Sequence, residues 1–286
     1  MNIVIIQEAG RHEKNKNFRE SLCLENGFNK IKGVNAKVWG LNYPDFRPFS
    51  EIEKWADVIF IIENYTSSWI PVADIQKSKK IKVFWSIDSH CVLDQHRNLC
   101  NILKIDILLN STDDYIKFFK GIVKESHWFP NAYPDNLIDD SRIEKTVDVG
   151  FCGNILNREN WLKYLEKYNI KKDVFIIGDD MVKAIKSYKI HFNRNISNDI
   201  NYRTFETTGC GTLLLTNYTP NLEKLFKIDE EILVYKDGND LDRKIIEALN
   251  DPDYRKSIED AGYKRAKSDH TYSKRCEQAF DIFQKV

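Results

Sequence analysis

Short apolar runs alternate with amphipathic segments along the first half of the chain. The runs predict strands at residues 3–6, 37–41, 57–62, 81–87 and 105–110, and helical patterns lie between most of them. Strands that are apolar on both faces are typical of parallel sheets covered by helices. The first half therefore predicts a doubly wound α/β domain.

A second set of apolar runs follows a proline-marked passage at residues 129–140, which we interpret as an interdomain linker. Strands are expected at residues 147–152, 174–177, 190–192, 212–216 and 232–234. This half is also expected to be Rossmann-like. We expect an N-terminal domain over residues 1–135 and a C-terminal domain over residues 136–271.

The chain beyond Asp240 has a helical pattern to its end. One apolar stripe comprises Leu241, Ile245, Ile246 and Leu249, and another contains Phe280 and Phe283. For the terminal helix, residues 272–286, the pattern leaves two placements open. It either crosses back onto the N-terminal domain or caps the C-terminal one.

Composition is that of a globular enzyme with no global charge bias. The chain has 286 residues, 42% of them hydrophobic, with 43 basic and 43 acidic residues. Because the net charge is zero, overall charge gives no reason to expect nucleic-acid binding. A local groove lined with basic residues is still possible. No segment has the roughly 20 apolar residues that cross a bilayer, and an apolar run begins at once, so no signal peptide and a cytoplasmic location are expected.

The richest chemistry lies in residues 201–218, NYRTFETTGCGTLLLTNY. Arg203 and Glu206 are three apart, so on a helix they share a face. A guanidinium beside a carboxylate suits a ligand that carries phosphate and ribose hydroxyls, and a simple salt bridge is equally open. Gly209 and Gly211 allow a tight turn into the strand that follows, where ligands of α/β sheets collect.

This segment resembles the donor-binding segment of GT-B glycosyltransferases, and more closely that of the CgeB-like (spore maturation) branch. The likeness extends through the second half of the chain. It includes VDVGFCGN at 147–154, IHFNRN at 190–195, VYKD at 234–237 and AGYKRAKSDHTYSKR at 261–275, and in the first half VFWSIDSH at 83–90. The resemblance implies two Rossmann-like domains with an interdomain cleft, and a nucleotide-sugar-dependent hexosyl- or pentosyltransferase.

Donor-binding residues follow partly from position and partly from this resemblance. Gly153 and Asn154 end a strand before a helix start, where backbone N–H groups favour an anion. The resemblance implies that Arg158 and Arg203 contact the diphosphate and that Glu206 holds the ribose. The remaining candidates are Gly178, Asn193, Phe205 and Thr207, although Gly178 as a turn and Thr207 as a helix cap are equally open.

Candidate catalytic residues lie where the strand at residues 81–87 ends. Asp88 and His90 are expected to face the interdomain cleft, where a carboxylate beside an imidazole can act as acceptor base or sugar clamp. Alternatively, Asp88 and Ser89 cap a helix that begins near Cys91. The two roles are compatible.

A second polar cluster follows the first strand. The resemblance to GT-B enzymes implies that Gly10, Arg11 and Glu13 contact the acceptor and that His12 is the alternative base. A solvated loop histidine is the simpler interpretation of His12.

No metal or other cofactor is expected, with the nucleoside-diphosphate sugar as co-substrate. Asp251-Pro252-Asp253 has an Asp-x-Asp spelling, but its proline and position indicate a turn that opens a helix. The phosphate-loop pattern GxxxxGK[ST] and a convincing GxGxxG fingerprint are both missing from the sequence.

Two other functions stay open on sequence alone. One is a nucleotide-sugar epimerase of the same fold. The other is a noncatalytic sugar-nucleotide or nucleic-acid binding module, for which a basic groove near Lys77, Lys79, Lys80 and Lys82 would argue. The acceptor is unspecified: a glycan, a protein, a small molecule or a nucleic-acid base.

Overall fold

The computed structural model describes residues 1–285, so Val286 of the expected terminal helix lies outside the described residues. The chain forms two compact units. The first unit comprises Met1–Asn131 together with the C-terminal segment that begins at Tyr272, and the second unit comprises Ala132–Thr271.

The first unit contains a parallel sheet of six strands in the order β2-β1-β3-β4-β5-β6. Five of them match the predicted apolar runs to within a few residues. The strands are β1 Asn2–Ile6, β2 Asn35–Trp39, β3 Val58–Ile62, β4 Ile81–Ser86, β5 Ile107–Asn110 and β6 Glu125–Trp128. The sequence did not predict β6, whose residues ESHW are polar and only partly buried.

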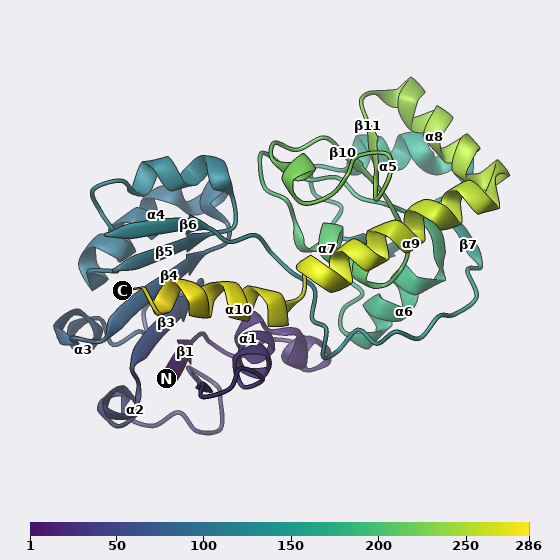
Figure 1. Ribbon diagram of the computed structural model, residues 1–286. Coiled ribbons are helices and arrows are strands. Elements are labelled where there is room, and N and C mark those ends of the chain that lie inside the picture. Colours follow the sequence, from purple (N-terminus) through teal and green to yellow (C-terminus); the bar gives the residue numbers. More distant parts are fainter. Residues whose placement is uncertain (286) are drawn as a thin grey trace. The chain divides into compact units, whose positions relative to one another are not determined.

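Helices cover both faces of this sheet (Figure 1). The helical elements of the first unit are η1 Glu13–Phe18, α1 Glu20–Phe28, α2 Phe49–Trp55, α3 Val72–Lys77, α4 Ser89–Leu103, η2 Asp113–Phe119 and α10 Tyr272–Phe283. One face contributes Ile59, Ile61 and Phe84 to a core shared with α2, α3 and α4. On the other face, Phe60 packs edge-on against Phe28 of α1 and Phe283 of α10.

The terminal helix α10 packs against α1 of the first unit (Figure 1). The two helices approach closely at Gly27, where an added Cβ would lie 2.6 Å from Cys276 Sγ. Arg275 also donates from Nε to the backbone oxygen of Pro130, at 2.8 Å. Residues far apart in sequence thus complete one domain.

The second unit contains a parallel sheet of five strands in the order β11-β10-β9-β7-β8. The strands are β7 Val147–Gly153, β8 Lys171–Val174, β9 Tyr188–Phe192, β10 Leu213–Asn217 and β11 Leu233–Tyr235. The helical elements are α5 Glu159–Tyr164, η3 Leu165–Tyr168, α6 Asp179–Ser187, α7 Tyr202–Gly209, η4 Leu222–Lys224, α8 Gly238–Asn250 and α9 Pro252–Asp269.

Two expectations in this unit are corrected. The strand predicted at residues 174–177 lies at Lys171–Val174, because Phe175 adopts a left-handed φ of 57° that ends it. On α8, Leu241 and Ile245 are buried as expected, but Ile246 is half exposed and Ala248 takes its place in the core.

Each sheet has one switch point, a pair of neighbouring strands whose connections run to opposite sides in the strand order. In the first unit this switch point lies between β1 and β3, and in the second between β7 and β9. The loops that follow the two strands at a switch point run to opposite sides of the sheet. In doubly wound proteins, ligands bind in the crevice between such loops, at the carboxyl ends of the strands. Within residues 1–285, no helix is long and apolar enough to span a membrane.

Candidate functional site

The switch point of the second sheet is flanked by the loop from β7 to α5 and the loop from β9 to α7. Strand β7 ends at Gly153, whose φ of 152° is rarely adopted by residues with a side chain. An added Cβ there would lie 3.9 Å from Arg203 Nε. The backbone conformation, and not a lack of space, therefore favours glycine at this strand end.

Arg203, on the first turn of α7, is held against this strand end. Its Nε donates to the backbone oxygen of Cys152 at 2.9 Å, and its Nη1 pairs with Glu206 Oε2. The salt bridge that the sequence left open is present. Glu206 is almost fully buried, at 8% exposure, so Arg203 neutralises a carboxylate that burial would otherwise penalise.

Arg158 occupies the N-cap position of α5. Its Nε donates to the backbone oxygen of Arg194 at 3.0 Å, and its Nη1 donates to the backbone oxygens of Asn154 and Leu156. One side chain therefore fixes both loops of the switch point.

Arg194 is a site residue that the sequence reasoning missed. It directly follows β9 and Asn193, and its guanidinium lies over the Trp161 ring and donates to the Tyr235 hydroxyl at 3.3 Å. A basic residue directly after a strand was the available indication. Burial, with the positive charges of Arg194 and Arg203, lowers the pKa of Arg158. Three guanidiniums thus gather at one strand edge, an arrangement that favours a multiply charged anion.

Three further donor candidates have buried side chains. Phe205 and Thr207 are fully buried, and the Thr207 hydroxyl bonds His191 Nδ1 at 2.6 Å. The side chain of Asn193 is buried in a reciprocal amide pair with Asn201, the N-cap residue of α7. All three side chains are buried, and the polar groups of Thr207 and Asn193 have partners inside the unit.

The remaining two donor candidates are turn-forming residues. Asn154 Oδ1 accepts from the backbone N–H of Leu156 at 3.0 Å, a bond that bends the loop before Arg158. Gly178, with φ of 64°, is the N-cap of α6 and does not end a strand. Gly178 therefore has the conformation of a turn residue, as one of its two interpretations predicted.

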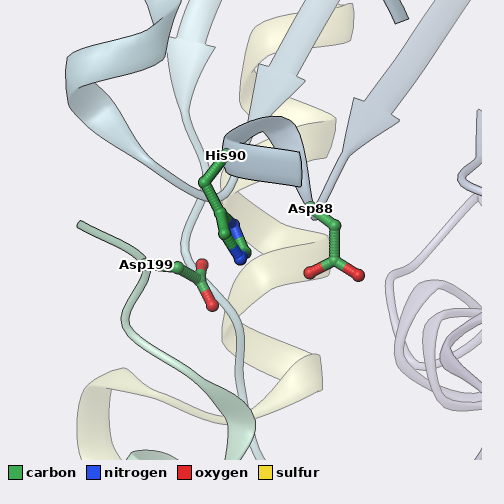
Figure 2. A group of neighbouring side chains, drawn as sticks. All are labelled: Asp88, His90 and Asp199. Carbon is green, nitrogen blue, oxygen red and sulfur yellow. The ribbon is translucent and has the colours of Figure 1, made fainter. Parts of the chain in front are cut away.

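In the first unit, Asp88 and His90 lie at the start of α4, directly after β4 (Figure 2). The helix begins at Ser89, slightly earlier than expected. Asp88 holds the N-cap position, but its side chain makes no capping bond. The capping role is therefore wrong for the Asp88 side chain, and the backbone N–H of Asp88 donates to Glu63 Oε2 at 2.8 Å.

The cluster after β1 lies at the same edge of the first sheet. Gly10, Arg11 and the exposed His12 precede η1, in which Glu13 is the first residue. Arg11 lies 4.1 Å above the Tyr65 ring and 3.5 Å from Glu8. Because β1, β3 and β4 are neighbours, this cluster and Asp88 belong to one polar edge.

The Asp-x-Asp spelling is part of a helix start. Asp251 is the N-cap of α9 and accepts from the backbone N–H of Tyr254 at 2.9 Å, with Pro252 in the first turn. This is the turn that the proline predicted.

The family model described as glycosyl transferase-like matches residues 136–281, slightly more than half of the chain. The chain belongs to this glycosyl transferase-like family. The match includes Arg158, Arg194 and Arg203. Comparison with curated protein sequences finds no match.

Solved structures show the same fold as this family member. An alpha-glucosyltransferase in complex with UDP aligns with a TM-score of 0.72 and 11% identity, over 99% of this chain and 100% of that chain. T4 phage BGT in complex with its UDP-glucose substrate aligns with a TM-score of 0.69 and 13% identity, over 100% of this chain and 99% of that chain. Sucrose-phosphate synthase from Thermosynechococcus elongatus aligns with a TM-score of 0.68 and 11% identity, over 100% of this chain and 98% of that chain. The predicted GT-B fold with two parallel sheets is confirmed.

Proposed function

We propose that this protein transfers a sugar from a nucleoside-diphosphate sugar to the hydroxyl of an acceptor, with the CgeB-like branch as its place in the family. The observation that carries the proposal is the gathering of Arg158, Arg194 and Arg203 at the switch point of the second sheet. A diphosphate leaving group develops negative charge as the sugar departs. Fixed guanidiniums stabilise that charge without reorganising.

The donor nucleotide is proposed to be uridine diphosphate. Support comes from the structural relatives, since the alpha-glucosyltransferase was solved with UDP and T4 phage BGT with UDP-glucose. Glu206 takes the ribose in this proposal. One of its oxygens pairs with Arg203, and a carboxylate accepts further bonds from ribose hydroxyls.

The first unit is proposed to supply the base for the acceptor hydroxyl. Asp88 and His90 stand at its carboxyl edge, and the loop from Gly10 to Glu13 shares that edge. The reaction needs no cofactor in this scheme. Positioning of the two substrates and neutralisation of the diphosphate supply the catalysis.

Calorimetric titration with UDP, ADP, GDP and CDP tests the donor proposal. We expect UDP to bind most tightly, and Glu206→Gln to reduce the preference for UDP over 2′-deoxy-UDP. The exposed Glu247→Gln on α8 is the matched control and should bind like the wild type. Equal ribose discrimination in a folded Glu206→Gln protein would remove Glu206 from the site.

Turnover is the second measurement. Incubation with UDP-sugars and candidate acceptors should release UDP together with a glycosylated product. Conversion of the UDP-sugar to its epimer without a glycosylated product would instead assign an epimerase. Binding without any conversion would assign a noncatalytic module.

A further inference from the structure

Glu63 is a carboxylate that neither the sequence motifs nor the proposed catalysis uses. It directly follows β3, and its side chain is only 20% exposed. Its Oε2 accepts the backbone N–H of Ile87 at 3.1 Å and that of Asp88 at 2.8 Å. Glu63 therefore fixes the turn that carries Asp88 and leads to His90.

The side chain of Glu63 also meets that of Asp88. The two carboxyl groups are within hydrogen-bonding reach of each other. Two ionised carboxylates have only acceptor atoms, so such a bond needs a proton on one of them. A proton shared between the two carboxyl groups would meet this requirement.

The groups around the pair do not neutralise it with a fixed positive charge. His96 of α4 has Nε2 3.5 Å from Glu63, but burial lowers the pKa of His96 to about 4, so the ring is neutral near pH 7. Its Nδ1 is bonded to the buried Ser86 hydroxyl at 2.7 Å. Arg19 is engaged by Glu20, a third carboxylate near the pair, at 3.1 Å.

Two charged neighbours, His90 and Glu20, also act on Asp88. His90 favours its ionised form, and Glu20 disfavours it. Burial and the negative charge of Asp88 raise the pKa of Glu63 to about 7. Burial raises the pKa of Asp88 as well, so the pair holds a proton at a higher pH than ordinary carboxyl groups do.

We propose that Glu63 is a positioning residue that shares a proton with Asp88 and so tunes Asp88 as the base for the acceptor hydroxyl; this rests on the proposed function. In the transfer, Asp88 takes the hydroxyl proton while the acceptor oxygen bonds to the anomeric carbon. The bond between that carbon and the diphosphate breaks, and the diphosphate leaves with the electron pair.

Proton loss from Glu63 changes the basicity of Asp88. Asp88 then loses a hydrogen bond that stabilised its ionised form, and it faces a second negative charge. Both effects make it hold an incoming proton more strongly. Transfer should therefore accelerate as pH rises through the titration of Glu63.

The first experiment is independent of catalysis. Carbon-13 NMR titration of the carboxyl groups in the full chain should give a Glu63 midpoint near 7 in the wild type. In Asp88→Asn, where the neighbouring charge is gone, the midpoint should fall by at least about one pH unit. A midpoint that is the same in both proteins, or an ordinary one in the wild type, would overturn the sharing of a proton.

The second experiment follows kcat/KM for UDP-sugar transfer between pH 6 and 8. A group titrating near 7 predicts a rise of about tenfold in the wild type. Glu63→Gln should lose this rise and be about tenfold slower at pH 8, with UDP affinity unchanged. Glu51→Gln on α2, an exposed position of the same unit, is the control and should keep the rise.

The outcomes separate this proposal from the proposed function. If the wild type transfers sugar and folded Glu63→Gln keeps the full pH rise, the role of Glu63 is wrong and the glycosyltransferase proposal stands. If Glu63→Gln does not fold, the Asp88→Asn titration decides. If the wild type turns over no nucleotide sugar although Glu63 and Asp88 titrate as a pair, the proposed function fails.

Discussion

At the residue scale, the second unit concentrates like charges around one strand edge. Arg203 is offset by Glu206, whereas Arg158 contacts backbone oxygens and Arg194 lies on Trp161 and donates to Tyr235. The site therefore carries excess positive charge before a ligand arrives. A diphosphate would offset this charge, which makes affinity sensitive to each guanidinium.

Arg194→Ala tests this charge directly. Loss of one charge-assisted bond is worth about 1.5–3 kcal/mol, so UDP affinity should fall by roughly 10–100-fold while uridine affinity hardly changes. Calorimetry with both ligands measures the difference. Arg243→Ala, an exposed arginine on α8, should leave both affinities unchanged. Equal weakening of UDP and uridine would show that Arg194 supports the fold of the loop and not the phosphates.

His90→Ala tests the first unit. If His90 handles a proton or clamps the sugar, kcat should fall by roughly 10²–10⁴-fold, the range for a positioned acid or base. UDP affinity should stay at the wild-type value, because the proposed donor residues belong to the second unit. Normal turnover by a folded variant would contradict the assignment and move the test to His12.

At the element scale, the sequence predicted most strands because buried parallel strands are apolar on both faces. It failed at one edge strand of each sheet. Strand β6 is polar and pairs with one neighbour only, so it lacks the apolar run that marks a strand. Strand β8 is also an edge, and the apolar residues after it form a turn that begins with the exposed Phe175.

The same limit applies to the site. Strand ends that lie next to each other were predictable, since Gly153 and Arg158 follow one apolar run and Arg203 precedes another. Burial was not predictable: Thr207 is fully buried, and its hydroxyl is bonded to His191 Nδ1, a contact that the sequence does not indicate. Glu63 was missed for a related reason: its partner Asp88 lies on a different loop, and only the order of the strands brings the two together.

The contact between α1 and α10 provides a prediction for an element. Gly27→Ala places a Cβ 2.6 Å from Cys276 Sγ, and overpacking of this kind costs about 1–3 kcal/mol. This exceeds the gain of at most about 1 kcal/mol from replacing a helical glycine. Urea unfolding should therefore show a net loss of stability.

The double variant Gly27→Ala/Cys276→Ala is the control. Removing Sγ makes room for the new methyl group, so the second substitution should cost less in the Gly27→Ala background than in the wild type. Strictly additive effects would mean that the two helices are not in tight contact at Gly27.

At the scale of the whole molecule, charge is balanced overall and segregated locally. The 43 basic and 43 acidic residues cancel, so no long-range field is available to attract a nucleotide sugar. Specific charge sits instead at the carboxyl edges of the two sheets. Arginines gather at the edge of the second unit, whereas the edge of the first carries the carboxylates Glu20, Glu63 and Asp88 together with Arg11 and Arg19. In the proposed function, the edge of the second unit binds the diphosphate and that of the first removes the acceptor proton.

The division of charge also leads to a prediction about metal dependence. With three arginines at the proposed diphosphate site, the leaving group needs no divalent ion to offset its charge. UDP affinity should be the same in excess EDTA as in magnesium or manganese, and sugar transfer should persist with chelator present. The measurement is calorimetry of UDP binding paired with a turnover assay. Loss of affinity in EDTA would contradict the arginine assignment, whereas loss of turnover alone would place a metal requirement in the chemical step.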